Sequence, residues 1–136
     1  MTEIIGLVRP LKRLAKTSRS KRCQVACFFI KNGAIISSGV NHNPTGQPME
    51  DLVDGKLVSR PEVVHAEVAA IEAARQNGVN LAGSTLLLTT SPCINCARQI
   101  AELNIAQLDF LYEWWDKAAL ELLRSRGIKI KQIKEL

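Results

Sequence analysis

The hydrophobic pattern at the start of the chain has the period of an amphipathic helix. Four apolar residues share one face over residues 7–17: Leu7, Leu11, Leu14 and Ala15. Residues 23–30 and 34–40 are instead rich in β-forming residues, and Asn32-Gly33 between them is typical of a two-residue hairpin turn. The pattern therefore predicts a helix followed by an antiparallel pair of strands.

Residues 41–61 show little periodicity. Prolines and glycines are spread through this segment: Pro44, Gly46, Pro48, Gly55 and Pro61. We expect a long loop here, and a loop of this length inside a compact domain is usually functional.

From residue 63 onward, helical and strand-like segments alternate. The predicted helices are residues 63–76, 93–103 and 115–126, and the predicted strands are residues 85–89, 106–112 and 128–133. Asn77-Gly78 and Gly127 mark the ends of the first and last of these helices. This order predicts the α/β class, with a mixed sheet covered by helices on both faces.

Composition indicates one soluble domain, residues 1–136. Hydrophobic residues make up 46% of the chain and charged residues 23%, and the apolar runs are far shorter than the ~20 residues of a membrane-spanning helix. The opening Met1-Thr2-Glu3 lacks the basic start and apolar stretch of a secretory signal. We therefore expect a cytoplasmic protein without membrane contact, in which the four cysteines favour metal binding over disulfides.

The formal net charge of +5 is concentrated in the first third of the chain. No Asp or Glu occurs between Ile4 and Met49, a stretch that contains these basic residues: Arg9, Lys12, Arg13, Lys16, Arg19, Lys21, Arg22 and Lys31. Two interpretations stay open. The charge either solvates a helix face or attracts an anionic substrate or a nucleic acid.

Two short motifs carry the candidate chemistry. His65-Ala66-Glu67 lies at one predicted helix start, and Pro92-Cys93-Ile94-Asn95-Cys96 lies at the next. Because Cys93 and Cys96 are three residues apart, both sulfurs point the same way within one helical turn, and the helix N-terminus favours their thiolate forms. We expect these two thiolates and His65 to bind one zinc ion.

Three protein ligands leave a fourth position for water, which is typical of catalytic zinc. Glu67 is then placed to accept a proton from that water and pass it onward. The Cys93 and Cys96 pair has two other interpretations. It could be a redox pair, or it could bind a structural zinc in a non-catalytic binding module, with Cys23 or Cys27 as the fourth ligand. Glu67 argues against the structural zinc, because a purely structural site needs no proton carrier.

The H-x-E and P-C-x-x-C motifs resemble the signature of the cytidine deaminase superfamily. Within it, the chain is most similar to compact bacterial and phage deoxycytidylate (dCMP) deaminases. The stretches that carry this likeness are Gly39-Val40-Asn41, residues 65–71, residues 83–93 and residues 119–128. The resemblance implies a three-layer α/β/α sandwich with a central mixed five-stranded sheet.

The resemblance also implies a reaction. Water activated by zinc would attack C4 of cytosine while Glu67 protonates N3 and then the amino group, converting dCMP to dUMP and ammonia. One zinc per subunit is expected, because residues 42–60 lack the extra cysteine and histidine ligands of relatives with a second, structural zinc. Such relatives commonly form dimers or hexamers, so a homo-oligomer is expected.

Substrate contacts follow from the same resemblance. Asn41 would bond the sugar, the Ala66 amide would bind the pyrimidine carbonyl, and the Ser91 carbonyl would accept from the departing amino group. Tyr112 would face the site. The residue before Asn41 is often aromatic in these families but is Val40 here.

The phosphate of a nucleotide needs cationic or amide donors. The candidates directly precede the first strand: Arg19, Lys21 and Arg22. Arg60 is a further candidate, and each of these could equally be a plain surface residue. His42 is either a locally bonded loop histidine or a contact to sugar or phosphate, and one of Trp114 and Trp115 could stack on the base.

Two other deaminases are rival interpretations. A tRNA adenosine deaminase shares both zinc motifs and would use the basic N-terminal stretch to contact RNA. The chain's ending around Gly127-Ile128 is more similar to the nucleotide enzymes. A deaminase of free cytosine or guanine is the second rival.

Overall fold

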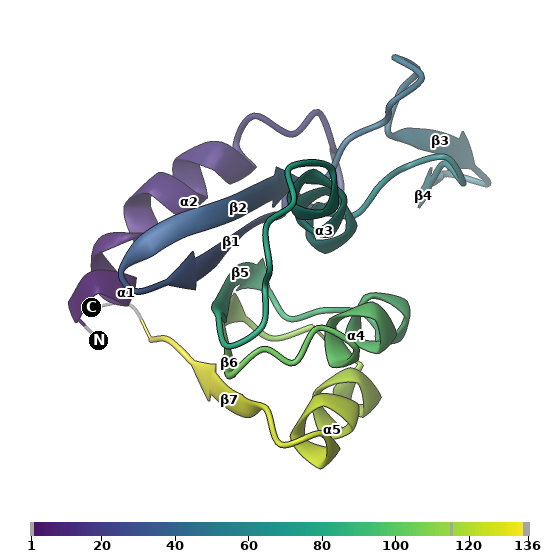
Figure 1. Cartoon of the computed structure of the whole chain (residues 1–136). Coiled ribbons are helices and arrows are strands. Elements are labelled where there is room, and N and C mark those ends of the chain that lie inside the picture. Colours follow the sequence, from purple (N-terminus) through teal and green to yellow (C-terminus); the bar gives the residue numbers. More distant parts are fainter. Residues whose placement is uncertain (1, 115, 135–136) are drawn as a thin grey trace.

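A five-stranded sheet forms the centre of the computed structural model, which describes residues 2–114 and 116–134. The strands lie in the order β2 (Ala34–Val40), β1 (Ala26–Lys31), β5 (Thr85–Thr90), β6 (Gln107–Tyr112) and β7 (Lys129–Gln132). β1 is antiparallel to both β2 and β5, whereas β5, β6 and β7 are parallel. The sheet is mixed, as predicted (Figure 1).

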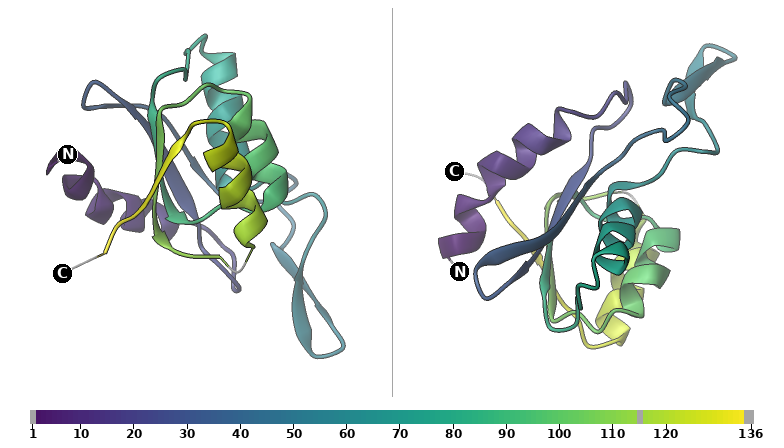
Figure 2. Two further views of the ribbon diagram at one scale, coloured as in Figure 1. Left: turned by 90° about the horizontal axis from the view of Figure 1, so that it is seen from below. Right: turned by 45° about the horizontal axis from the view of Figure 1, so that its top comes forward.

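Helices cover both faces of this sheet. α3 (Ala66–Gln76), α4 (Ile94–Ala101) and α5 (Lys117–Ser125) lie on one face, and α1 (Thr2–Gly6) and α2 (Val8–Ala15) lie on the other (Figures 1 and 2). The predicted three-layer α/β/α sandwich is confirmed. Within residues 2–114 and 116–134, no helix is long and apolar enough to cross a membrane.

β1 is buried on both faces, which explains its almost unbroken apolar sequence. Cys27 and Phe29 pack in the core beneath α3, α4 and α5, whereas Phe28 and Ile30 pack in a second core with Leu11 of α2. The side chains of residues 26–30 therefore tie the sheet alternately to the two helical layers.

The predicted hairpin turn between β1 and β2 is confirmed. Asn32 and Gly33 have φ angles of 53° and 78°. Two successive residues with positive φ form the turn whose twist matches that of the flanking strands, and asparagine and glycine tolerate this conformation best.

The prediction of a long loop over residues 41–61 is wrong in part. This segment contains a second hairpin, β3 (Glu50–Val53) and β4 (Lys56–Ser59), which projects from the sandwich (Figures 1 and 2). Asp54 and Gly55 form its turn, with φ angles of 51° and 77°. The Asp-Gly dipeptide was the available signal, but neither strand has a buried face that would produce an alternating pattern.

Two element boundaries shift where other hydrogen bonds replace regular pairing. α3 begins at Ala66 and not at residue 63, because Val64 exchanges backbone hydrogen bonds of 2.8 and 3.0 Å with His42. β1 begins at Ala26 and not at residue 23, because the Val25 amide donates to the Asn41 side chain at 2.9 Å.

The two ends of the chain differ slightly from the prediction. The N-terminal helical segment begins earlier than expected and is divided into α1 and α2. The last helix begins at Lys117, with the Asp116 carboxylate accepting a hydrogen bond from the Ala118 amide as its N-cap. Trp115, which the prediction placed at the start of this helix, lies outside the described residues.

A glycine lets α3 lie directly on β2. A Cβ atom at Gly39 would lie 2.2 Å from the Ala66 carbonyl oxygen and 2.7 Å from the Ala70 amide nitrogen. Two residues earlier on the strand, the Ser37 hydroxyl donates to the Ala70 carbonyl at 2.7 Å. The first turn of α3 is thus held against the sheet by backbone atoms that have no room to yield.

We predict that Gly39→Ala destabilises the fold by about 2 kcal/mol, because the added methyl group must push backbone and not a flexible side chain. Thermal unfolding followed by circular dichroism should show a Tm lower by about 7 °C. Ser38→Ala, at the exposed neighbouring position, is the control and should leave the Tm unchanged. Equal Tm values for the two variants would contradict the close packing of α3 on β2.

Candidate metal centre and active site

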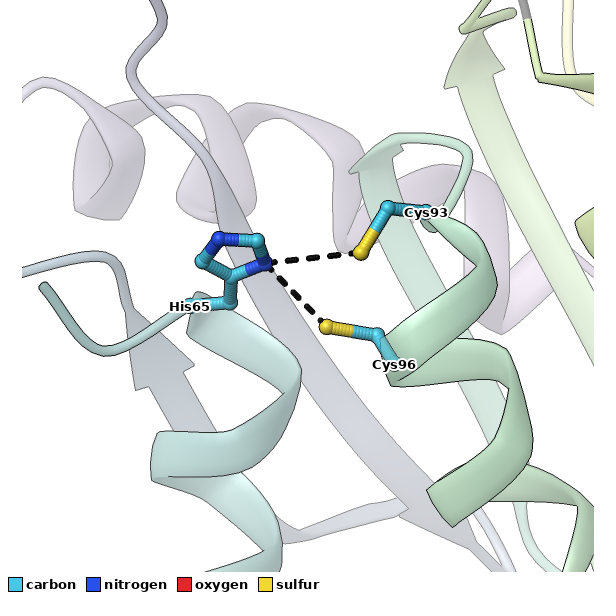
Figure 3. A group of neighbouring side chains, drawn as sticks. All are labelled: His65, Cys93 and Cys96. Atoms are coloured by element: carbon cyan, nitrogen blue, oxygen red, sulfur yellow. Dashed lines mark hydrogen bonds between the residues drawn. The ribbon is translucent and has the colours of Figure 1, made fainter. Parts of the chain in front are cut away.

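The two sequence motifs lie at the N-termini of neighbouring helices. His65 is the N-cap residue of α3 and Cys93 is the N-cap residue of α4, each with an extended backbone before the helix begins. Neither side chain forms a capping hydrogen bond to its own helix. Both side chains instead point into the space between the helices, where they meet Cys96 of the first turn of α4 (Figure 3).

The ligand atoms of His65, Cys93 and Cys96 all lie within 4.8 Å of one another. The His65 Nδ1 atom is 3.2 Å from the Cys96 sulfur and 3.7 Å from the Cys93 sulfur. Tetrahedral zinc with bonds of about 2.1 Å to nitrogen and about 2.3 Å to sulfur needs ligand separations of this size. The donor set and its spacing therefore fit one zinc ion with a fourth position left open.

Hydrogen bonds within this trio make one thiol strongly acidic. The bonds from Cys96 and His65 lower the pKa of Cys93 to about 3. The bond to Cys93, followed by burial, raises the pKa of Cys96 well above its usual value, and the bond to Cys93 also raises the pKa of His65. One thiolate is thus available to a cation, and binding of a divalent ion releases the proton of the other thiol.

Neither remaining cysteine belongs to the converging group found among the described residues. Cys27 is buried, and its thiol donates to the Ala66 carbonyl at 3.4 Å. Cys23 is partly exposed and lines the cavity beside the trio. The geometry therefore gives no support to a four-ligand site completed by either residue.

Glu67 is a buried carboxyl group beside this centre. Its side chain is 4% exposed and lines the same cavity as His65 and Cys93. Burial raises the pKa of Glu67 to about 7, because the charged form loses its hydration. A carboxyl group that titrates near neutral pH can both take up and return a proton.

A cavity of about 240 Å³ opens beside the trio. Four of the predicted substrate contacts line it: Arg22, Asn41, Ala66 and Ser91. Trp114, one of the two tryptophans considered for stacking on the base, also lines it. The structure thus brings residues from five separate parts of the chain into one compartment.

The other predicted contacts lie elsewhere. Arg19, Lys21 and His42 line a neighbouring cavity of about 580 Å³, and the His42 Nδ1 atom lies 3.0 Å from the Val40 carbonyl. Tyr112 lines neither cavity; its side chain is 52% exposed, and the Lys12 ammonium lies 5.8 Å from its ring centre. These residues therefore lie apart from the compartment that contains the trio.

Arg60 has carboxylate partners and does not line either cavity. Its guanidinium lies 2.8 Å from Asp51 and 2.8 Å from Glu62. Hydrogen bonds to Glu62 and Asp51 raise the pKa of Arg60 above its usual value. This residue fastens the base of the β3–β4 hairpin to the chain that enters α3.

Asn41 is fixed in the cavity wall by two hydrogen bonds. Its Oδ1 atom accepts from the Val25 amide at 2.9 Å, and its Nδ2 atom donates to the Cys23 carbonyl at 2.8 Å. An asparagine amide has two N–H donors, so one further donor is available to a ligand. The side chain is preorganised rather than free to rotate.

Ser91 joins two segments of the wall. Its amide donates to the Tyr112 carbonyl at 2.9 Å, and its hydroxyl accepts from the Trp114 amide at 2.6 Å. The loop that leads to Cys93 is thereby tied to the segment after β6, which carries Trp114.

Sequence reasoning missed part of the cavity wall. The additional lining residues are Ser20, Val25, Met49, Glu50, Ser59, Val63 and Thr90. Glu50 and Ser59 come from the hairpin that was predicted as loop. Glu50 was the available signal, because it is the first acid after the long acid-free stretch.

Known proteins resemble this chain in sequence and in structure. Residues 1–112 match the family model for the cytidine and deoxycytidylate deaminase zinc-binding region. The deoxycytidylate deaminase of Enterobacteria phage T2 is 27% identical over 168 aligned positions, which cover 88% of this chain and 87% of the phage protein.

Solved structures show the same fold. The dCMP deaminase of cyanophage S-TIM5, crystallised with dCMP and dUMP, has a TM-score of 0.85 and 26% identity over 95% of each chain. A structure from studies of tRNA:A34 deaminases has a TM-score of 0.52 and 21% identity, covering 83% of this chain and 77% of that one. At 21% identity the second likeness shows the fold alone.

We predict that Cys93→Ser lowers zinc affinity by more than about 100-fold, because a ligand matters at least as much as the groups that orient it. Mass spectrometry of the purified protein, after dialysis against a weak chelator, should find about one zinc per wild-type chain and almost none in the variant. Cys23→Ser is the matched control and should keep its zinc. Equal loss in both variants would contradict the three-ligand assignment.

Proposed function

The chain belongs to the cytidine and deoxycytidylate deaminase family, and from this premise we propose that it converts dCMP and water to dUMP and ammonia. The observation that carries the proposal is the buried Glu67 carboxyl, which lines one cavity together with His65 and Cys93 of the convergent trio. The phage T2 and cyanophage S-TIM5 proteins, both named as dCMP deaminases and both similar over most of their length, support dCMP as the substrate.

The chain binds one zinc ion, which His65, Cys93 and Cys96 would hold. Zinc in such a three-ligand site supplies a water molecule of lowered pKa. Glu67 would take one proton from water and pass it to the ring nitrogen N3 as the water oxygen bonds to C4. It would then take the proton of the new C4 hydroxyl and pass it to the amino nitrogen, so that the C4–N bond breaks and ammonia leaves. Because its pKa lies near neutral, the carboxyl can serve in both directions.

The cavity wall supports an orientation for the cytosine. The Ala66 amide lies in the first turn of α3, where N–H groups lack helical partners, and is proposed to donate to the pyrimidine carbonyl. The Ser91 carbonyl is proposed to accept from the amino group. Asn41 offers its second N–H to the sugar, and the Trp114 ring is proposed to close over the base.

Of the basic residues considered for the phosphate, Arg22 has the best support. It lines the cavity, and its guanidinium donates to the Ser59 hydroxyl at 3.1 Å. Arg19 and Lys21 line the neighbouring cavity instead, as does His42. Among these basic side chains, we therefore propose only the Arg22 guanidinium as a phosphate contact.

We predict that Glu67→Gln lowers kcat for dCMP by about 10³-fold, because the amide keeps the shape of the side chain but cannot carry the proton. Zinc content should stay at the wild-type level. Glu72→Gln, on the exposed side of the same helix, is the control and should keep full activity.

The substrate class is tested by ammonia release with dCMP, CMP, deoxycytidine, cytosine and a tRNA anticodon stem. We expect the highest kcat/KM with dCMP. Turnover of the tRNA alone would overturn the nucleotide assignment in favour of adenosine deamination. Tight zinc binding without turnover of any compound would favour a binding module.

We further propose that the chain forms a homo-oligomer through the β3–β4 hairpin. Its side chains include exposed apolar residues: Leu52 at 72%, Val53 at 49%, Val58 at 46% and Leu57 at 37% exposed. A two-stranded hairpin of this kind is marginally stable alone in water, and clustered exposed apolar side chains are typical of interaction surfaces.

Leu52→Ser combined with Val58→Ser is expected to shift the wild-type oligomer to monomer, because the apolar contact area is lost. Sedimentation velocity at equal chain concentration measures this. Ile35→Ser, an exposed apolar residue on β2, is the control and should keep the wild-type assembly. A monomeric wild-type protein would contradict the proposal.

A cytoplasmic location is also proposed, because a nucleotide substrate is supplied inside the cell. Residues 1–136 are proposed to act as one deaminase domain.

A further inference from the structure

One carboxylate in the wall of the cavity has no role in the proposed chemistry. Glu50, the first residue of β3, lines the cavity together with Ser20, Arg22 and Ser59. This group contains an acid where an anionic substrate would need donors.

Hydrogen-bond donors from the segment before β1 converge on Glu50. The Ser20 hydroxyl donates to Oε2 at 2.5 Å, and the Lys21 amide donates to Oε1 at 3.1 Å. The Ser20 hydroxyl in turn accepts from the amides of Arg22 and Cys23, at 3.3 and 3.1 Å. The turn at residues 20–23 is thus folded around the Glu50 carboxylate.

The donors themselves are of the kind that bind phosphate. A hydroxyl group, consecutive backbone N–H groups and a nearby guanidinium form an anion-binding cradle in many proteins. Here the group that occupies the cradle is a carboxylate of the same chain. Burial would raise the pKa of Glu50, but the hydrogen bonds from Ser20 and the backbone outweigh it and hold the pKa below its usual value.

We propose that Glu50 is a resident anion that occupies the phosphate cradle before the nucleotide binds and is displaced by the 5′-phosphate of the nucleotide. This inference rests on the proposed function, because it assigns the phosphate of that substrate to the turn at residues 20–23. Glu50 would keep the hydrogen-bond donors of the cradle organised until substrate binds. A phosphate monoester would then have to compete with this one carboxylate for the same donors.

Displacement is feasible because Glu50 lies at the edge of a strand and is only partly buried. Its carboxylate can turn into water, whereas two anions cannot share one set of donors without strong repulsion. The apparent affinity for phosphate is then the intrinsic affinity multiplied by the fraction of time that the cradle is free. If Glu50 leaves it one-tenth of the time, the loss is about tenfold.

The experiment compares zinc-loaded, full-length wild type with Glu50→Gln. The neutral amide keeps one oxygen acceptor for Ser20 but competes poorly with an anion. Isothermal titration calorimetry with inorganic phosphate should give a Kd about tenfold lower for the variant. In steady-state kinetics, the ratio of kcat/KM for dCMP to kcat/KM for deoxycytidine should rise by a similar factor, through a lower KM for dCMP.

Asp51→Asn is the matched control, because it removes the neighbouring carboxylate that bonds Arg60 and leaves the cradle intact. Its phosphate Kd should equal that of wild type. An unchanged or higher phosphate Kd in Glu50→Gln overturns the proposal. A loss of activity that is equal for dCMP and deoxycytidine also overturns it, since Glu50 would then bind the sugar or only support the turn.

Failure of the proposed function has a different signature. If wild type does not deaminate dCMP while Glu50→Gln still binds phosphate more tightly, the substrate assignment fails and the cradle stands. If dCMP is deaminated and neither protein binds phosphate, the function stands and the cradle is wrong.

Discussion

The close seating of α3 on β2 is the constraint on which the rest of the site depends. Ala66 touches the sheet at Gly39, and the residues on either side of Ala66 are the imidazole and the carboxyl of the candidate centre. A displacement of about 1 Å at this contact would move both groups relative to the thiols of α4, and metal and proton-transfer geometries tolerate little displacement. The two thiols are positioned by α4, whereas the imidazole and the carboxyl are positioned by α3. The geometry of the site therefore depends on how α3 and α4 lie relative to each other.

Burial then gives the carboxyl its chemical character. The same packing that excludes water from Glu67 raises its pKa to about 7, while His65 and Cys93 line the cavity, where an ion can reach them. At the N-termini of α3 and α4, the protein therefore places the Glu67 carboxyl, which resists ionisation, near the Cys93 thiol, which ionises readily. This contrast follows from the surroundings of each side chain in the fold, since both residues would have ordinary pKa values in water.

The sequence predicts the ligand trio and the sandwich well, because both depend on local signals. The spacing of Cys93 and Cys96 and the Asn32-Gly33 turn need no knowledge of distant contacts. Glu50 could not be predicted in the same way: its contact with Ser20 joins residues thirty positions apart through an exposed hairpin without a buried face. Tyr112 was placed at the site by likeness alone and His42 by its position beside Asn41 in the loop, and neither residue lines the cavity beside the trio.

The β3–β4 hairpin supplies Glu50 and Ser59 to the cavity but none of the metal ligands. Its length, charge and tip can therefore change by mutation or insertion while the reaction centre keeps its residues and their support. With the contacts proposed for Glu50, such a division would let substrate preference evolve separately from the reaction chemistry. An engineer who wished to redirect the enzyme to a different nucleotide would begin by exchanging residues 50–59 as a cassette.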